Sequence, residues 1–236
     1  QSKQRRPSGH QLHFENRAVL DLEFIIKPII DNMGYPSLGI ELFIERTKVQ
    51  HIRSFLEGVQ SGHSCQLSSV FLYDPSLHCF QSEADSVIQH LIQLIHDGAD
   101  SSVFNNEELL PIPPSSWKQL QTLLKRAPLV KLEHNGFTFN PLQITEELPP
   151  LQFEFLEAGT TGYWLKVKGL SRMVVLNAHG SVLSAGKIIN LNAEDCQHLE
   201  EIKKMLDISG TNQIFIHQEQ IAPFFEKVVP GLRRLG

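Results

Sequence analysis

Cysteine is scarce in this sequence, and long apolar runs are absent from it. The 236 residues include only Cys65, Cys79 and Cys196, which are too few and too scattered for a disulfide framework. Scattered cysteines in odd number favour free thiols in a reducing compartment, so we expect a cytoplasmic protein. A membrane helix needs about 18 or more consecutive apolar residues, and no such run exists. The polar start also has no apolar segment of a signal peptide, so we expect no membrane partner.

An excess of positive charge is also missing. The chain has 21 Lys and Arg residues and 26 Asp and Glu residues, which gives a formal net charge of −5. This charge argues against a protein that binds nucleic acid over its whole surface. The basic residues near the two ends are nevertheless suitable for phosphate contacts, with solvated tails as the alternative. These candidate contact residues are Lys3, Arg5, Arg6 and Arg17 near the start, and Arg233 and Arg234 near the finish.

A phosphate-binding P-loop is not present either. The segment Gly180 to Lys187, GSVLSAGK, has five residues between its glycines where a P-loop has four. Ile188 follows the lysine, where the motif needs Ser or Thr to hold magnesium. We therefore interpret the segment as a hairpin between two strands, with its glycines at the turns.

No set of side chains makes a convincing catalytic or metal site. His63, Cys65, His78 and Cys79 could be combined into a zinc site, but their spacing matches no common zinc pattern. Cys196 lies on the apolar face of an expected helix, which favours a buried small hydrophobe. We predict no catalytic, cofactor-binding or metal residues and no small-molecule substrate. A free-standing hydrolase is the distant alternative, and a cleft with paired titratable groups would indicate it.

What the sequence does contain is alternation of period two. Between Leu151 and Leu191 it predicts a central antiparallel meander, in which Tyr163, Leu165 and Val167 face a core. Trp164, Lys166 and Lys168 then form an outward row. Exposed aromatics beside charges often mark interfaces, so this row is a candidate protein contact. The alternative is that Trp164 packs under a helix.

The remaining patterns predict an α+β fold: antiparallel sheets with packed amphipathic helices, in two closely associated lobes. We expect a linker at residues 1–16, an N-terminal α+β lobe at 17–108, and a C-terminal α+β lobe with the meander at 109–236. A buried strand over 17–30 should pair with a half-exposed strand over 38–45. Asn135-Gly136 predicts a hairpin turn, and Ser82 with Asp85 and Asn192 with Asp195 predict helix caps. Ser115 or Ser116 should cap another helix.

Four stretches together resemble the helicase-associated domain that precedes the motor in bacterial Swi/Snf-family DNA-dependent ATPases. They are LGIELFIERTKVQHIRSFL (38–56), FLYDPSLHCFQSEADSVIQHL (71–91), LPPLQFEF (148–155) and QIFIHQEQIAPFFEKVVPGLRRLG (213–236). In this family the VVPGL-type segment lies just before the ATPase core, so we expect a fragment that ends upstream of the motor.

The resemblance implies a parent protein that hydrolyses ATP and moves on DNA or remodels DNA complexes, often with a SWIM-type zinc finger near its N-terminus. ATP, magnesium and zinc are then expected only in parts of the parent outside this chain. The P-loop, the acidic helicase box and the zinc ligands of such parents have no match here. No catalytic or metal residue is therefore carried over.

The resemblance and the missing catalytic groups together predict a non-enzymatic accessory domain. It would position DNA or regulate the motor of the same polypeptide, with the terminal basic residues as contacts. We expect it in the cytoplasm, where it could associate with the nucleoid. The alternative is a protein-interaction module that recruits the parent to transcription or repair machinery through the row of Trp164, Lys166 and Lys168.

Overall fold

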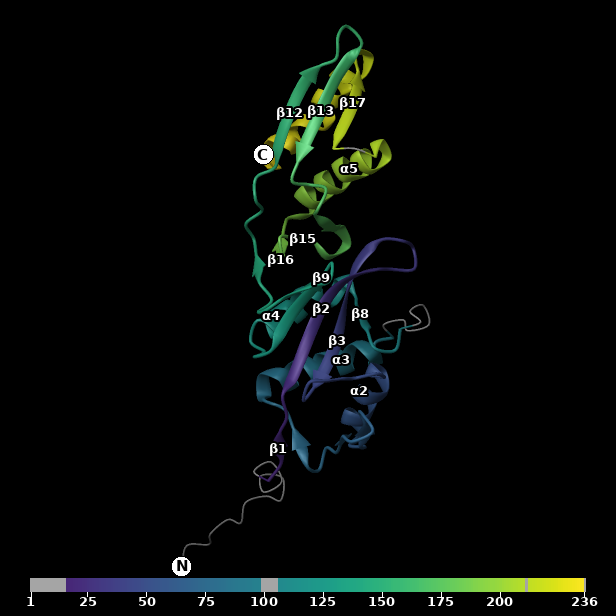
Figure 1. Cartoon of the computed structure of the whole chain (residues 1–236), viewed down its shortest axis with the longest axis vertical. Coiled ribbons are helices and arrows are strands. Elements are labelled where there is room, and N and C mark those ends of the chain that lie inside the picture. The colour runs from purple at the N-terminus through teal and green to yellow at the C-terminus, as the bar shows by residue number, and fades with distance from the viewer. Residues whose placement is uncertain (1–15, 99–105, 211, 236) are drawn as a thin grey trace, which may run out of the picture. The chain divides into compact units, whose positions relative to one another are not determined.

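The chain has an α+β fold, as the sequence predicts, and it divides into two compact units, Gln1–Pro141 and Leu142–Gly236. The computed structural model (Figure 1) describes residues 16–98, 106–210 and 212–235, with the backbone alone at residues 225 and 234. The expected linker, residues 1–16, lies outside the described residues apart from its last position.

A six-stranded sheet organises the first unit. Its strands run in the order β10 (Phe137–Phe139), β9 (Val130–His134), β2 (Leu22–Ile30), β3 (Pro36–Ile44) and β4 (Thr47–Lys48), and β8 (Leu110–Ile112) also pairs with β3. Strands β2 and β3 form an antiparallel hairpin, whereas β9 joins β2 in parallel. Two short strand pairs also belong to the described part of this unit: β1 (Ala18–Val19) with β7 (His78–Cys79), and β5 (Cys65–Gln66) with β6 (Leu72–Tyr73).

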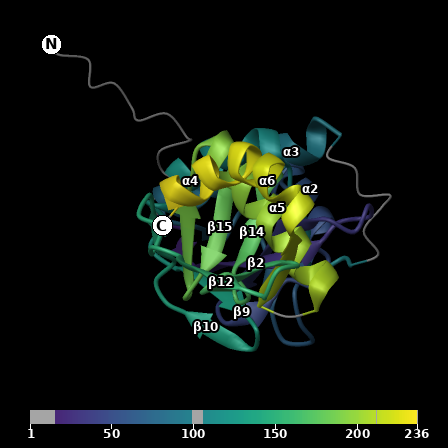
Figure 2. The same ribbon diagram turned by 90° about the horizontal axis from the view of Figure 1, so that it is seen from above.

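Three amphipathic helices cover one face of this sheet. They are α2 (Ile52–Ser61), α3 (Ser82–His96) and α4 (Pro114–Leu124), which lie together on one side of the strands in Figures 1 and 2. The register places Phe24 opposite Leu42 and Ile26 opposite Ile40, and all four side chains are fully buried. Alternate residues of β2 and β3 thus supply the apolar layer beneath the helices.

The opposite face of β3 differs from the sequence prediction of a half-exposed strand. Glu41 is only 2% exposed. Its carboxylate is covered by ion pairs with Lys27 and Lys48. At Gly39, a Cβ atom would lie 2.7 Å from Leu109 Cδ2, so Leu109 fills the space that the missing side chain leaves. The strand is therefore buried on both faces, one of them through paired charges.

The first unit extends past residue 108, where we expected the lobe boundary. Residues 109–141 supply β8, α4, β9 and β10 to it. Strand β8 pairs with Leu38–Ile40 of β3, and β9 pairs with Phe24–Ile26 of β2. Alternation around Asn135-Gly136 predicts the β9–β10 hairpin but not β8, and local patterns carry no information on a partner some 70 to 100 residues earlier in the chain.

The second unit contains two sheets, which corrects the prediction of one continuous meander. Strands β12 (Gln152–Glu157), β13 (Gly162–Lys168) and β17 (Gln213–His217) form one antiparallel sheet. The other has the order β11 (Ile144–Thr145), β16 (Lys187–Asn190), β15 (Ser181–Ser184) and β14 (Val174–Leu176). The chain leaves the first sheet after Gly169, at φ 93°, because the buried side chains of Leu170 and Met173 turn it into the core.

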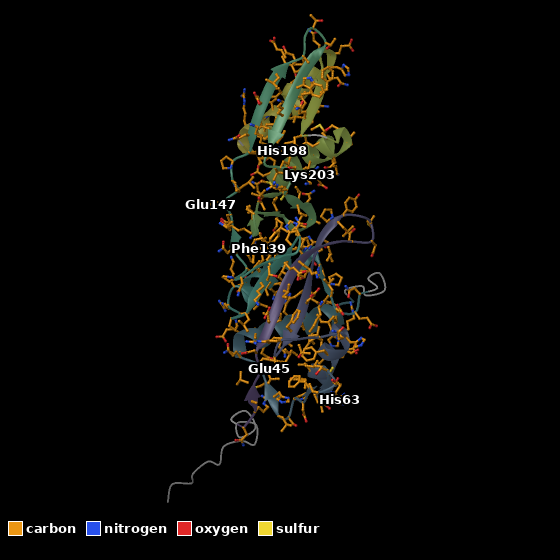
Figure 3. All side chains as sticks on the ribbon, viewed as in Figure 1. Glu45, His63, Phe139, Glu147, His198 and Lys203 are labelled. Carbon is orange, nitrogen blue, oxygen red and sulfur yellow. The ribbon has the colours of Figure 1, made fainter. Side chains whose placement is uncertain are left out.

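Helices α5 (Ala193–Ser209), α6 (Ile221–Lys227) and α7 (Val229–Leu235) complete this unit, with 3-10 turns at Asn177–His179 and Gln218–Gln220. Leu165 and Val167 of β13 pack in one buried cluster with Leu199 of α5 and Leu232 of α7. Helix α7 also packs closely on α5, because a Cβ atom at Gly231 would lie 2.6 Å from the ring of His198, which Figure 3 labels.

The predicted turns and caps have mixed outcomes. The hairpin at Asn135 and Gly136 is confirmed, with φ of 52° and 76° at the two turn residues. The cap at Asn192 is also confirmed, since its side chain accepts from Asp195 N. The caps predicted at Ser82 and at Ser115 or Ser116 are wrong: α3 is capped by Gln81 and α4 by Pro113, neither with a side-chain cap bond.

Candidate functional site

The outward face of the β12–β13–β17 sheet gathers aromatic and basic side chains from β13 and β17, beside polar and apolar side chains from β12. In the strand register, Trp164 lies between Leu156 and Phe215, and Lys166 lies between Glu154 and Gln213. We call this surface the Trp164 face. Its residues are Gln152, Glu154 and Leu156 of β12, Gly162, Trp164, Lys166 and Lys168 of β13, and Gln213, Phe215 and His217 of β17.

The predicted orientation of β13 is confirmed by burial. Leu165 and Val167 are 0% and 1% exposed on the core side, whereas Trp164 is 38% exposed on the other. The neighbours of Trp164 on its own face are strand residues, because the helix-packed residues belong to the opposite row. The interpretation of Trp164 as a residue packed under a helix is therefore wrong.

Three rings form a cluster on the Trp164 face. The Trp164 and Phe215 ring centroids are 5.1 Å apart at an interplanar angle of 63°. Those of Phe215 and His217 are 4.8 Å apart at 89°. Both geometries are edge-to-face, the arrangement that aromatic quadrupoles favour. Contact with neighbouring rings holds each ring at a defined angle on a partly exposed surface.

Sequence reasoning missed Phe215 and His217 as members of this site. The signal was present in the segment QIFIH, where Ile214 and Ile216 alternate with Phe215 and His217. What was lacking was the partner: β17 pairs with β13 across some 50 residues of intervening chain. Gly162 contributes as well, since a Cβ atom there would lie 2.9 Å from Phe215 Cζ. The absent side chain leaves space for the phenyl ring.

The two lysines of this face carry charge that no described carboxylate neutralises. Glu154 is the register partner of Lys166, but no ion pair joins the two side chains, and none joins Lys168 to any described acid. A shallow hollow is lined by Gln152, Glu154, Lys166 and Lys168, together with Phe153. Both ammonium groups are thus available to a ligand.

The lysines of the sheet in the first unit, by contrast, form ion pairs with glutamates. Lys27 Nζ lies 2.5 Å from Glu41 Oε1, and Lys48 Nζ lies 3.2 Å from Glu41 Oε2. Burial lowers the pKa of Lys48, but hydrogen bonds and charge from Glu108 and Glu41 outweigh that effect and raise it overall. Lys131 pairs with Glu23 at 2.9 Å. These lysines hold strands together, whereas those of the Trp164 face have no such role.

The six terminal basic candidates are only partly described. Lys3, Arg5 and Arg6 lie outside the described residues, as does the side chain of Arg234. Arg17, in the first unit, donates from Nη1 to the carbonyl oxygen of Pro75 at 3.2 Å. Arg233 is exposed on α7 of the second unit. The structure therefore assigns Arg17 a local contact and leaves Arg233 on the surface.

The residues considered for zinc are not arranged as a metal site. His78 Nδ1 accepts a hydrogen bond from Asp74 N at 3.0 Å, and Cys65 and Cys79 are half-buried free thiols. In the described ranges, no group of three or more His, Cys, Asp or Glu side chains could hold a metal ion. Cys196 is fully buried, and burial, then the charges of Asp195 and Glu200, raise its pKa to about 11. Its thiol is therefore neutral at physiological pH.

The P-loop-like segment is a hairpin, as the sequence predicts. Ser181–Ser184 and Lys187–Asn190 pair antiparallel across a turn in which Ala185 and Gly186 have φ of 50° and 74°. The backbone amides of the segment therefore belong to two paired strands, which are joined by a two-residue turn. Across the residues that the structure describes, no helix is long and apolar enough to cross a membrane.

Fold and surface together define an α+β module with a partly exposed face of aromatic and basic side chains. Residues 108–236 match a family model described as bacterial SNF2 helicase associated. Because the match covers more than half of the 236 residues, the chain belongs to the bacterial SNF2 helicase-associated family. No curated protein and no solved structure matches the chain.

The family match confirms the resemblance drawn from the sequence. It contains two of the four stretches on which that resemblance depends, 148–155 and 213–236. It begins at residue 108, beside the boundary expected from the sequence, and it includes the whole second unit with the Trp164 face. The family region and the compact units thus divide the chain at different places.

Proposed function

We propose that this chain is a non-catalytic accessory domain of a bacterial Swi/Snf-type ATPase, and that it positions DNA for the motor. Family membership supports the association with such a motor. The observation that carries DNA contact is the Trp164 face, which lies within the family region and presents two lysines that pair with none of the described carboxylates. Cations of this kind attract phosphates and release the counterions bound to them.

This proposal assigns different ligands to different parts of such a protein. The motor would bind ATP and magnesium, and a SWIM-type finger, where one exists, would bind zinc. This chain would supply a surface for DNA and a contact for the motor of the same polypeptide. Arg233, exposed on α7, is a candidate for either contact. Arg17 is the weaker candidate, because its guanidinium already donates to Pro75.

Deletion of the second unit, residues 142–236, from an ATPase that carries it tests the proposal. We expect weaker binding to duplex and forked DNA, with a shallower salt dependence, and less DNA-stimulated ATP hydrolysis. The control is charge reversal of Lys118, exposed on α4 of the first unit, which should leave both quantities unchanged. Unchanged DNA affinity with altered basal hydrolysis would replace DNA positioning with direct regulation of the motor. If neither quantity changed, the proposal would be wrong.

A further inference from the structure

We infer that the Trp164 face binds unpaired bases of nucleic acid, with Trp164 and Phe215 stacking on bases and Lys166 and Lys168 contacting phosphates. The inference rests on the proposed function and specifies both the surface and the form of nucleic acid that it takes.

The aromatic side chains of this face lie outside the hydrophobic core. Trp117, the other tryptophan of the chain, is 1% exposed, whereas Trp164 is 38% exposed on the side of the sheet away from the helices. Aromatic side chains on open surfaces stack on bases without regard to sequence, because every base has a π face. The edge-to-face contacts of Phe215 with Trp164 and His217 fix the rings before a ligand arrives.

The spacing of the lysines suits an extended strand of nucleic acid. Trp164, Lys166 and Lys168 are alternate residues of β13, so they project from one face at intervals of about 6.6 Å. That interval is on the scale of one nucleotide in an extended single strand. An aromatic ring followed by two cations along one row therefore matches a base followed by backbone phosphates.

The charge of the face also favours a polyanion. Its two lysines against one glutamate, Glu154, leave one net positive charge, while the whole chain carries −5. A duplex fits this surface less well, because the face is an open sheet of three short strands, without a helix or a two-stranded ribbon that could enter a major groove. Bases present their flat faces to aromatic side chains only when they are unpaired.

Tryptophan fluorescence gives a direct readout of stacking. In the Trp117→Phe variant of the 236-residue chain, Trp164 is the remaining tryptophan. We expect a short oligothymidylate to quench its fluorescence on binding. An abasic oligonucleotide of equal length, with phosphates but no bases, should bind at least fivefold more weakly and should not quench. The same titrations of the unmodified chain check that the substitution of Trp117 does not create the effect.

Variants of the face separate stacking from charge. Trp164→Ala should weaken oligothymidylate binding about tenfold, and Trp164→Phe should restore most of the loss, because base–aromatic stacking tolerates a change of ring. Lys166→Gln with Lys168→Gln should lower the salt slope by about 1.4, at about 0.7 for each phosphate contact on a single strand. Glu154→Gln should tighten binding. Matched controls are Phe137→Ala, at a ring 67% exposed on β10, and Lys118→Gln on α4, which should change nothing.

The outcomes distinguish this inference from the proposed function. Equal binding of the abasic and ordinary oligonucleotides, or oligothymidylate binding insensitive to Trp164→Ala, would overturn base stacking and leave DNA positioning intact. Absence of binding to any nucleic acid would overturn the inference. Combined with an unchanged ATPase after deletion of residues 142–236, it would overturn the proposed function too, and the face would then fit a protein partner.

Discussion

Phe215 lies over Gly162 on the Trp164 face, in the space that a side chain at position 162 would occupy. A Cβ atom at Gly162 would lie 2.9 Å from Phe215 Cζ and would also clash with the carbonyl oxygen of Ile216. The carbonyl belongs to the backbone of β17 and cannot move aside without disturbing the β13–β17 pair. Gly162 is thus required for the third strand of the sheet and for the aromatic cluster on it.

The Gly162→Ala variant should therefore lose stability in the second unit. Overpacking of this kind costs about 1–3 kcal/mol, and we expect the upper half of that range because backbone must shift. Urea denaturation followed by Trp164 fluorescence, in the Trp117→Phe background, measures the effect. Gly58→Ala, in the first unit and followed by Trp117 fluorescence in the Trp164→Phe background, is the control: the nearest atom to its Cβ, His63 O, lies 3.3 Å away, and we expect a change below about 1 kcal/mol. Equal effects of the two substitutions would contradict the close approach at Gly162.

The N-terminus of α5 gives a second prediction. The Asn192 side chain accepts from Asp195 N at 2.8 Å and donates from Nδ2 to Asp195 Oδ2 at 3.0 Å. Asn192→Ala leaves that amide without its partner, so we expect a loss of about 1 kcal/mol in the unfolding free energy of the second unit. Gln81, at the N-cap of α3, makes no side-chain cap bond, and Gln81→Ala should be nearly neutral. A larger effect at Gln81 than at Asn192 would reverse this assignment.

These two caps show what the sequence could and could not predict. Asn192 and Asp195 have the predicted spacing, and the helix begins between them. Ser82 and Asp85 have the same spacing, but α3 begins one residue earlier, so Ser82 falls within the helix and its hydroxyl bonds to Glu83. A capping motif specifies which residues could cap, while packing of the apolar face decides where the helix starts.

The sheets show the same limit at longer range. Local patterns predicted β2, β3, β12 and β13, and alternation placed the outward row of β13, since that row depends on residues two apart. It could not predict that β9 joins β2 or that β17 joins β13. The aromatic cluster exists only through the second of these pairings. The outward row of β13 could therefore be predicted from a single strand. Phe215 and His217 join the site only through the tertiary fold.

The buried carboxylate of Glu41 gives a third prediction. Its side chain is 3% exposed and contacts both Lys27 and Lys48, whose side chains are 26% and 30% exposed. Glu41→Gln leaves two cations close together without their shared anion. Removing one partner of a buried ion pair typically costs 3–5 kcal/mol, and we expect about 2–4 kcal/mol because water reaches both lysines. Urea denaturation of the first unit, followed by Trp117 fluorescence, measures the loss.

Glu133 provides the matched control for Glu41. It also pairs with Lys27, at 3.6 Å, but its side chain is 39% exposed. Ion pairs at exposed positions contribute about 0–1 kcal/mol, so Glu133→Gln should have an effect below about 1 kcal/mol. A loss at Glu133 as large as that at Glu41 would show that burial does not set the strength of this network.

The thiol of Cys196 predicts a loss of stability at alkaline pH. Burial, then the charges of Asp195 and Glu200, raise its pKa from an ordinary value of 9.0 to about 11 in the folded chain. Between these values the unfolded chain releases the thiol proton while the folded chain retains it. The unfolding free energy should therefore fall by up to about 1.4 kcal/mol per pH unit from pH 9 to 11, and the contribution of Cys196 should be constant below pH 9.

Other groups titrate in the same range, so the comparison must be made with Cys196→Ala. That variant loses some stability at pH 7 because it leaves a small cavity, but it cannot lose the thiol contribution as pH rises. The difference in unfolding free energy between the unmodified chain and the variant should shrink or change sign between pH 8 and 10.5. Urea denaturation under reducing conditions at several pH values, followed by Trp164 fluorescence in the Trp117→Phe background, measures that difference. A difference independent of pH would mean that water reaches the thiol in the folded chain, contrary to its complete burial in the apolar cluster between α5 and the elements that pack on it.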